Sequence, residues 1–334
     1  MCKADSMSQA PPTDDFAASQ PLAHSIFSPF SIVSFCIELL VLFHRVTVAV
    51  VRGCFRFVFP RAPKNIVGRN VLVTGAANNI GCMLAWEFAL RGANLILVDL
   101  DDEGCVGLAK NIQDIGQAVK VYKCDLTKRE EINRVMSDIL RETGRVDILV
   151  NNAGIVSARR LLDCPDAVIQ RVMDLNIMAS IWMTKAVLPG MLERNYGHIV
   201  NIASLSGHIG IGGLVDLSTS KFASVGFSEA LGQELKQLHK EVKVSAVCPS
   251  LLDRGMFEGA KSRFPSPLKP QYAIGQIMRG VLMDQEVIFI PWYMQYTPIF
   301  KAILPVGAFS ALVDFATGMD IMKNIKGSRK TSLL

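Results

Sequence analysis

From residue 68 onward, short apolar runs alternate with longer segments whose apolar residues recur at helical spacing. Short apolar runs are typical of strands buried on both faces, and the periodic segments are typical of amphipathic helices. We expect strands at NVLVTG (70–75), NLILVD (94–99), VKVYKCD (119–125), VDILVNNAG (146–154), GHIVNIAS (197–204) and KVSAVCPS (243–250). We expect helices at 78–92, 128–142, near 165–188 and at 218–238. This alternation predicts parallel βαβ units and an α/β fold with a doubly wound parallel sheet.

The N-terminal region is apolar without the helix–strand alternation. Residues 26–43 (IFSPFSIVSFCIELLVLF) have about the minimum length of a membrane helix, and a second apolar piece at 46–60 is interrupted by Arg52 and Arg56. Basic residues follow the first run and acidic residues precede it, which favours a cytosolic main domain. The run lacks the basic lead and cleavage site of a signal peptide. A spanning helix, a monotopic hairpin and an interfacial helix remain open.

The C-terminal part, roughly residues 286–318, is apolar again. Prolines at 291, 298 and 305 prevent one long helix. The aromatic residues at 292, 293 and 296 suit a membrane interface. A strand and helix that complete the domain, or a dimer contact, explain the same pattern.

Composition narrows the class of protein. The chain has 334 residues and a net charge of +5. Its mean hydropathy of +0.31 is high for a soluble enzyme and indicates a membrane-associated part. Lys and Arg are spread along the chain, so nucleic-acid binding has little support. The eight cysteines show no metal-binding spacing, and no metal is expected. Scattered cysteines in apolar contexts favour a reducing, cytosol-facing location.

The first predicted strand leads into a glycine-containing turn, VLVTGAANNIG (71–81). A phosphate group binds well to the backbone amides at such a helix N-terminus, where Gly75 makes the turn and Gly81 allows close packing. Asp99 ends the next strand, where a carboxylate accepts hydrogen bonds from ribose hydroxyls and repels a 2′-phosphate. This spacing predicts a Rossmann-type dinucleotide site that prefers NAD over NADP.

The motifs TGAANNIG, Asp99, CDLTK, NNAG, Asn176, Ser204 and Lys221 occur in the order typical of the short-chain dehydrogenase/reductase family, which this chain resembles over about residues 68–290. The apolar N-terminus together with MFEGAKSRFPSPLKP, IPWYM and AILP resembles its membrane-attached branch of retinol and 17-beta-hydroxysteroid dehydrogenases. We therefore expect a disordered lead (1–24), a membrane anchor or hairpin (25–60), a Rossmann domain (68–290), and a C-terminal apolar extension with a basic tail (291–334). That branch implies the endoplasmic reticulum membrane or a lipid droplet, with the main domain facing the cytosol.

The resemblance also assigns the cofactor contacts. They are Gly75, Asn79, Ile80, Gly81, Asp99, Asp125, Leu126, Asn152, Ala153, Gly154, Lys221 and Pro249. Two have simpler explanations: Asp125 is well placed to cap a helix, and NNAG suits an ordinary turn. Asn79 replaces the family's middle glycine. Asparagine tolerates a left-handed backbone, but its side chain would intrude on the cofactor.

The family's catalytic group consists of a serine, an asparagine, a tyrosine and a lysine one helical turn after the tyrosine. Ser204, Asn176 and Lys221 match three of them, but Leu217 occupies the tyrosine position and cannot transfer a proton. No tyrosine occurs between Tyr196 and Tyr272, so no shift of register restores it. His208 is a hypothetical substitute because imidazole titrates near neutrality. Arg254 stands where the family has a threonine near the carboxamide.

Two functions follow from this pattern. The first is an NAD-dependent oxidoreductase for a lipophilic alcohol or ketone, such as a retinoid, a steroid or a fatty alcohol. The second is a catalytically degenerate relative that binds nucleotide and acts as a partner protein on a membrane or lipid droplet. The family often dimerises through the helices that carry Asn176 and Lys221, so we expect a homodimer or a heterodimer with a related dehydrogenase.

Overall fold

The computed structural model describes residues 29–59, 62–260 and 262–317. The chain forms two compact units, residues 1–61 and 62–334, and each is described by itself. The predicted disordered lead and the basic end of the tail lie outside the described residues.

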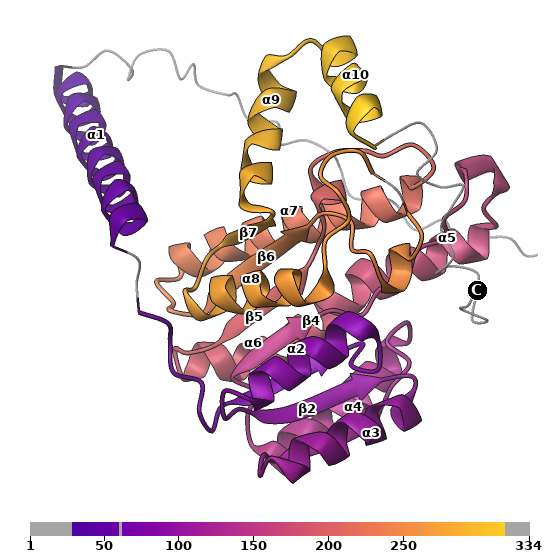
Figure 1. Ribbon diagram of the computed structural model, residues 1–334. Helices are drawn as coiled ribbons and strands as arrows, with labels where there is room; N and C mark the ends of the chain where they lie inside the picture. Colours follow the sequence, from indigo (N-terminus) through magenta and orange to yellow (C-terminus); the bar gives the residue numbers. More distant parts are fainter. Residues whose placement is uncertain (1–28, 60–61, 261, 318–334) are drawn as a thin grey trace, which may run out of the picture. The chain divides into compact units, whose positions relative to one another are not determined.

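The described part of the first unit is one apolar helix, α1 (Pro29–Val58) (Figure 1). The described parts of the two apolar pieces, residues 29–43 and 46–58, therefore join in a single helix, because arginine is a good helix former and does not interrupt it at position 52. The segment Val33–Gly53 is long and apolar enough to cross a membrane, and none of it is buried. Residues 166–193 also pass this test of length and composition, but they pack partly inside the second unit.

Within its described residues the second unit contains one seven-stranded parallel sheet, in the order β3-β2-β1-β4-β5-β6-β7. The strands are β1 (Asn70–Thr74), β2 (Asn94–Asp99), β3 (Val119–Lys123), β4 (Ile148–Asn151), β5 (His198–Ile202), β6 (Lys243–Pro249) and β7 (Val287–Ile290). All strands are parallel, because each connection crosses the sheet through a helix or a long loop and returns to the end at which the strands begin. The predicted doubly wound Rossmann-type fold is confirmed.

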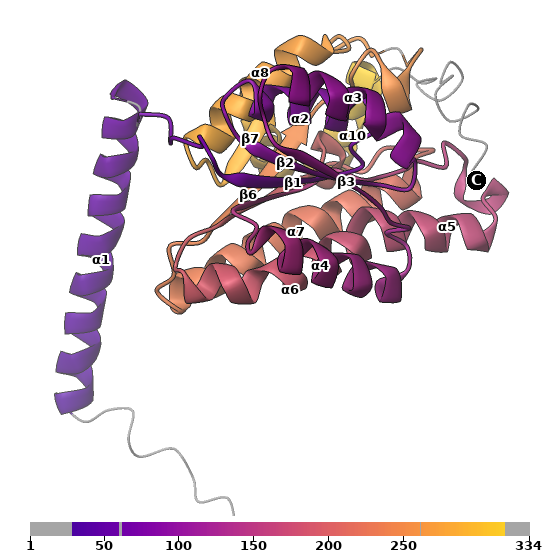
Figure 2. The ribbon, with the colours of Figure 1, turned by 90° about the horizontal axis from the view of Figure 1, so that it is seen from below.

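Helices cover both faces of the sheet, as Figure 2 shows with the sheet seen nearly edge-on. One layer contains α2 (Asn79–Ala89), α3 (Asp102–Asp114) and α8 (Pro270–Leu282). The other contains α4 (Arg129–Thr143), α6 (Ala179–Glu193) and α7 (Val215–Gln237), with α5 (Asp166–Met173) continuing into α6. Neighbouring strand residues point to opposite faces, so Val71 and Val73 pack against the first layer and Leu72 against the second.

Three local differences from the predicted elements affect the site. The helix expected near 165–188 is α5, then a π-helical segment, η3 (Asp174–Met178), and then α6. The helix expected from residue 218 begins earlier, at Val215. Strand β4 ends at Asn151, so residues 152–154 form the loop above it.

The C-terminal segment breaks at its prolines, as expected. Strand β7 joins the edge of the sheet beside β6, followed by the 3₁₀ turn η6 (Trp292–Tyr296) and the helices α9 (Thr297–Ile303) and α10 (Val306–Thr317). The expectation that a strand completes the domain is therefore right for residues 287–290. The described residues also contain the short 3₁₀ turns η2 (Leu161–Asp163), η4 (Leu205–Gly207) and η5 (Gly255–Phe257).

Candidate active site

A cleft opens at the carboxyl ends of the strands, beside the neighbouring strands β1 and β4, where the chain order of the sheet reverses. Parallel sheets bind ligands at this switch point because the two following loops diverge and leave a crevice. The cleft has a volume of about 710 Å³. A second hollow continues from it, since Ala77, Asn78, Gly154 and Ile155 line both. Together they form one trough across the top of the sheet.

The glycine turn after β1 permits close backbone packing. Gly75 has φ +65°, and a Cβ there would lie 2.8 Å from the Ala153 Cα atom. A Cβ on Gly81 would lie 2.1 Å from the Gly75 carbonyl oxygen, so no larger residue fits. Asn78 caps α2 because its Oδ1 accepts a hydrogen bond from the Gly81 amide at 3.0 Å. The α2 N-terminus therefore opens into the trough as a site for a phosphate.

Asn79 is the first residue of α2 and lines the cleft. The positive φ angle of this turn is at Gly75, and Asn79 has none. The expected reason for an asparagine, its tolerance of a left-handed backbone, is therefore wrong. Its side chain instead lies next to the η5 turn, since a Cβ on Gly255 would be 3.6 Å from its Nδ2.

Asp99, at the end of β2, holds two loops in place and keeps acceptor capacity. Its Oδ2 accepts a hydrogen bond from the Ala77 amide at 2.9 Å, and its Oδ1 accepts one from the Asp101 amide at 3.0 Å. Each carboxylate oxygen can accept a second hydrogen bond. Because Asp99 also lines the second hollow, that capacity faces the place where a ribose would bind.

Asp125 and Leu126 line the second hollow. The Asp125 Oδ1 accepts hydrogen bonds from the Thr127 amide and hydroxyl, at 3.1 and 2.7 Å. Burial opposes ionisation of Asp125, but these bonds and the Lys128 ammonium outweigh it and lower the pKa of the carboxyl group. The residue before α4 is Lys128, which makes no side-chain cap, so the simpler explanation of Asp125 as the helix cap is wrong.

The NNAG segment is tied to β1. Asn152 donates from Nδ2 to the carbonyl oxygens of Thr74 and Gly75, both at 3.0 Å, and its amide donates to the Thr74 Oγ1 at 3.0 Å. These bonds fix Ala153 and Gly154 at the trough wall. Thr74 was missed by the sequence analysis, although a threonine directly before the glycine turn is a usable signal. The segment is thus more than an ordinary turn.

Asn176 lies in the π-helical segment η3 and is 2% exposed. Its Oδ1 accepts a hydrogen bond from the Ile155 amide at 2.8 Å, and its Nδ2 donates to the Ile155 carbonyl and to the Ser220 Oγ, both at 3.0 Å. Asn176 therefore fixes the loop after β4 against α7. It lines neither the cleft nor the second hollow.

Lys221 lies on α7 and lines the cleft, although only 7% of the residue is exposed. Its Nζ donates a hydrogen bond to the Ile202 carbonyl at 2.7 Å. Burial lowers the pKa of Lys221 to about 8, with a small opposing effect from Cys248. Lys221 thus faces the cleft as a buried amine whose pKa lies closer to neutrality than that of an exposed lysine.

Ser204 and Leu217 meet where the cleft joins an apolar pocket, and both line the two cavities. The Ser204 Oγ accepts a hydrogen bond from the Ser206 amide at 3.1 Å and is 3.4 Å from the Pro249 carbonyl oxygen. Leu217 is 1% exposed and packs against Val156 and Leu214. At the position of the family's tyrosine hydroxyl, the wall of both cavities therefore carries the hydrocarbon side chain of Leu217.

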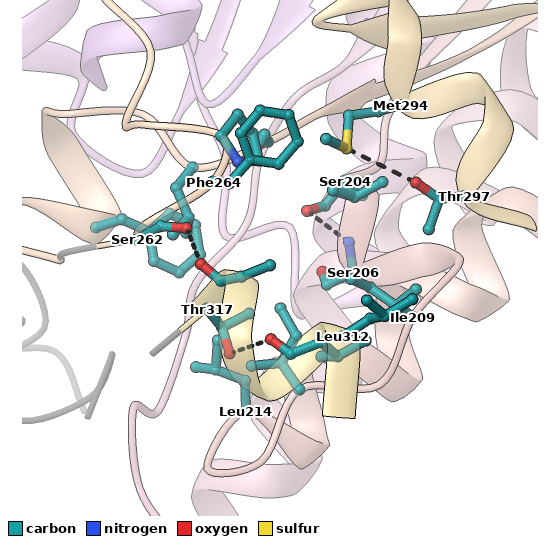
Figure 3. Close-up of a pocket in the computed structure, with 18 of the residues that line it drawn as sticks. Ser204, Ser206, Ile209, Leu214, Ser262, Phe264, Met294, Thr297, Leu312 and Thr317 are labelled. Atoms are coloured by element: carbon teal, nitrogen blue, oxygen red, sulfur yellow. Dashed lines mark hydrogen bonds between the residues drawn. The ribbon is translucent and has the colours of Figure 1, made fainter. Parts of the chain in front are cut away.

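The apolar pocket is built from segments far apart in the sequence (Figure 3). Its walls come from η4, the loop at 262–265 and the helices α9 and α10. Ser262 Oγ and the backbone amide of Phe264 both donate to the Ala316 carbonyl, at 3.0 Å each, which attaches the loop to α10. The apolar pattern of the tail alone does not indicate which of its residues line this pocket.

The position of His208 does not support the hypothesis that it is a substitute acid–base group. It lines neither the cleft nor the apolar pocket. Its Nε2 lies 3.5 Å from the Cys248 Sγ, and its ring packs on Phe289 with centroids 4.9 Å apart. Burial lowers the pKa of His208, so its neutral form is favoured.

Arg254 lines the cleft together with Asn79 and Pro249. A guanidinium group at this position adds a positive charge to a site suited to phosphates. Among the described residues no cluster of three His, Cys, Asp or Glu side chains could hold a metal ion. The trough thus offers helix-end amides, a cation and a free carboxylate acceptor, a set that fits a dinucleotide.

Comparisons with known proteins agree with this geometry. Residues 69–263 match the family model described as short chain dehydrogenase. The chain is 38% identical to retinol dehydrogenase 10-B of Danio rerio, over 85% of this chain and 92% of that protein. A short-chain dehydrogenase/reductase from Burkholderia phymatum, solved with NAD, has the same fold with a TM-score of 0.66 and 21% identity, over 72% of this chain and 94% of that one. A metagenomic short-chain oxidoreductase solved with NADP has a TM-score of 0.59 and 25% identity, over 68% and 98%.

Proposed function

Because this chain belongs to the short-chain dehydrogenase family, whose fold binds a nicotinamide dinucleotide, we propose that it is an NAD-dependent oxidoreductase for a lipophilic alcohol or ketone. The observation that carries the proposal is the junction of two cavities. Ser204, Leu217, Ser250 and Phe257 line both the cleft and the apolar pocket, so a ligand in the pocket has access to the cleft. The zebrafish relative named as a retinol dehydrogenase supports a retinoid-type substrate, and a steroid or a fatty alcohol has similar chemistry.

The preference for NAD rests on Asp99. Its carboxylate lines the hollow at the end of β2 with acceptor capacity left over, which suits two ribose hydroxyl groups. A 2′-phosphate would bring a second negative charge to the same place and be repelled. Arg254 lies at the cleft rather than beside this carboxylate, so it does not neutralise that repulsion.

The residues at the junction determine which parts of the reaction the chain itself can carry out. The nicotinamide, when bound, transfers the hydride. Ser204 is the hydroxyl that would hold the substrate oxygen, since it lines both cavities. Lys221 is the group we assign to the proton, because burial brings its pKa to about 8 and leaves part of it as a neutral amine near physiological pH. A positioned acid–base group contributes roughly 10²–10⁴-fold, so the loss of the tyrosine predicts slow turnover.

A specific observation favours the second function, a binding protein without turnover. Leu217 is fully buried between Val156 and Leu214, so the leucine completes an apolar wall rather than leaving a defect. Such a protein would keep nucleotide and a lipophilic ligand in adjoining cavities and act as a partner on a membrane or lipid droplet.

The test is NAD⁺-dependent oxidation of all-trans-retinol and of a 17-beta-hydroxysteroid by the full-length chain in membrane preparations. Ser204→Ala is the matched variant, because it removes one hydroxyl from the junction and no charge. We expect slow oxidation by the native chain and a further loss in the variant. A silent native chain that still binds NADH would support the binding protein and contradict the oxidoreductase.

We also propose attachment to the endoplasmic reticulum membrane or a lipid droplet through α1, with the second unit facing the cytosol. Apolar side chains are exposed along α1, among them Phe35, Leu40 and Phe43. They support this attachment because exposed apolar surface of this kind marks membrane interaction sites. Resistance of the full chain to alkaline carbonate extraction, and its release when residues 1–59 are removed, would support it. A homodimer or heterodimer remains a proposal from the family, which co-purification of differently tagged copies would test.

A further inference from the structure

Ser206 carries a buried hydroxyl that has no hydrogen-bond partner among the described residues. The residue is 3% exposed and lines the apolar pocket beside Ser204, as Figure 3 shows. An unpartnered buried hydroxyl is costly, because its hydrogen bonds to water are lost without replacement. In a native protein it therefore calls for an explanation.

The other hydroxyls of this pocket show that the situation of Ser206 is unusual. Ser262 donates to the Ala316 carbonyl at 3.0 Å, and Thr317 donates to the Val313 carbonyl at 2.8 Å. Thr297 contacts the Met294 Sδ at 3.7 Å, and Ser204 contacts Pro249. Ser250 is only half-buried, so water can reach it. The hydroxyl that is both buried and unpartnered is thus the one beside Ser204.

The backbone holds Ser206 firmly in this position. Its amide donates to the Ser204 Oγ at 3.1 Å, and the Gly207 amide donates to the Ser204 carbonyl at 2.9 Å. A Cβ on Gly207 would lie 2.6 Å from the Lys221 carbonyl oxygen, so η4 packs directly on α7. Ser206 cannot leave the pocket wall without breaking this contact.

We propose that Ser206 is a ligand-binding and specificity-determining residue, which donates a hydrogen bond to the oxygen of a lipophilic ligand whose remaining atoms are apolar. The inference rests on the proposed function, because that function places the ligand oxygen at the junction of the pocket with the cleft. The pocket end then holds the oxygen with two serine hydroxyls, Ser204 and Ser206, while Leu217 contributes only apolar contact. The ligand class is a long apolar molecule with one terminal hydroxyl or carbonyl group.

The experiment measures binding rather than turnover. The full-length chain in detergent micelles is titrated with all-trans-retinol and with its deoxy analogue, in which hydrogen replaces the hydroxyl group. We expect the native chain to bind retinol more tightly, and we expect Ser206→Ala to reduce that preference about fivefold, the value of one ordinary hydrogen bond. Ser137→Ala on α4 is the matched control and keeps the preference, because the Ser137 hydroxyl bonds to the Asn133 carbonyl and lines neither cavity.

A second measurement separates a ligand contact from a structural role. Ser206→Ala removes an unpartnered polar group, so the ligand-free variant is expected to unfold at the same temperature as the native chain or a higher one. An unchanged preference for retinol in Ser206→Ala would overturn the inference, as would failure of the native chain to bind retinol. A lost preference in a chain that never oxidises retinol would support the inference and contradict only the oxidoreductase.

Discussion

Leu217 and Lys221 lie one turn apart on α7 and both line the cleft, so a buried lysine amine has an apolar side chain as its neighbour along the helix. The Lys221 Nζ donates to the Ile202 carbonyl. Lys221 therefore faces the cleft without the tyrosine hydroxyl of the family pattern beside it, and we assign the proton transfer to the lysine itself.

Restoring the tyrosine should restore the rate. Leu217→Tyr places a phenol beside Lys221 at the junction of the two cavities, where the ammonium can lower the pKa of the phenol. We expect NAD⁺-dependent retinol oxidation to rise by roughly 10²–10⁴-fold. Leu217→Phe is the control, because it adds the ring without the hydroxyl. An equal rise in both variants would show that ring size, not proton transfer, had limited the rate.

The burial of Lys221 predicts a rise in stability at high pH. Its pKa falls from 10.5 to about 8 in the native chain, so between these values only the unfolded chain binds the proton. The free energy of unfolding should therefore increase as pH rises from about 8 to 10.5, while below pH 8 the full cost of burying the charge is present. The shift corresponds to on the order of 3 kcal/mol.

The measurement is chemical denaturation of the full chain without cofactor, at several pH values, for the native chain and Lys221→Met. Other titrating groups cancel in the difference between the two. We expect the advantage of the methionine variant at pH 7 to disappear toward pH 10.5. A difference that stays constant with pH would show that Lys221 titrates at its usual pKa.

The carboxylate of Asp99 should decide between the two dinucleotides. Asp99→Asn keeps an acceptor for the Ala77 amide but removes the charge that repels a 2′-phosphate. We expect the ratio of NADH to NADPH affinity to fall at least tenfold, measured by nucleotide fluorescence. Asp102→Asn is the control, since this nearby carboxylate pairs with Lys123 at 2.7 Å and does not line the hollow. An unchanged ratio in Asp99→Asn would remove the basis for preferring NAD.

The fold and the cofactor end could be predicted because their signals are local. A buried strand such as β2 is one apolar run, and the turn at Gly75 and Gly81 is fixed by contacts within a few residues and with the loop after β4. The acidic residue at the end of the next strand follows from the same βαβ geometry. Asn79 shows the limit: its identity was readable, but the backbone angle at that position was not.

The apolar pocket could not be predicted, because it depends on contacts between distant segments. Its wall joins Ser206 on η4 to Phe264 in a loop and to Leu312 on α10. No periodic pattern in the sequence indicates which of the apolar residues in the tail face this pocket and which remain exposed, as Phe315 does. The position of His208 could not be predicted for the same reason, because its packing against Cys248 and Phe289 depends on where β6 and β7 lie.

The contact between Gly81 and the Gly75 carbonyl makes the phosphate turn intolerant of any side chain. Gly81→Ala would place a Cβ 2.1 Å from that oxygen, so the start of α2 must move away from the turn. We expect a lower unfolding temperature and at least a tenfold loss of NADH affinity, because the amides that face the phosphate are displaced.

Gly107→Ala is the matched control for this change. Gly107 lies on the exposed side of α3, where a Cβ would meet nothing within 4 Å. Alanine in a helix interior is favoured over glycine by roughly 0.5–1 kcal/mol, so this variant should be slightly more stable and bind NADH normally. Calorimetry and NADH titration of the two variants distinguish a specific turn from a general effect of adding a methyl group. Normal NADH binding by Gly81→Ala would show that the turn yields, and that the trough does not depend on this contact.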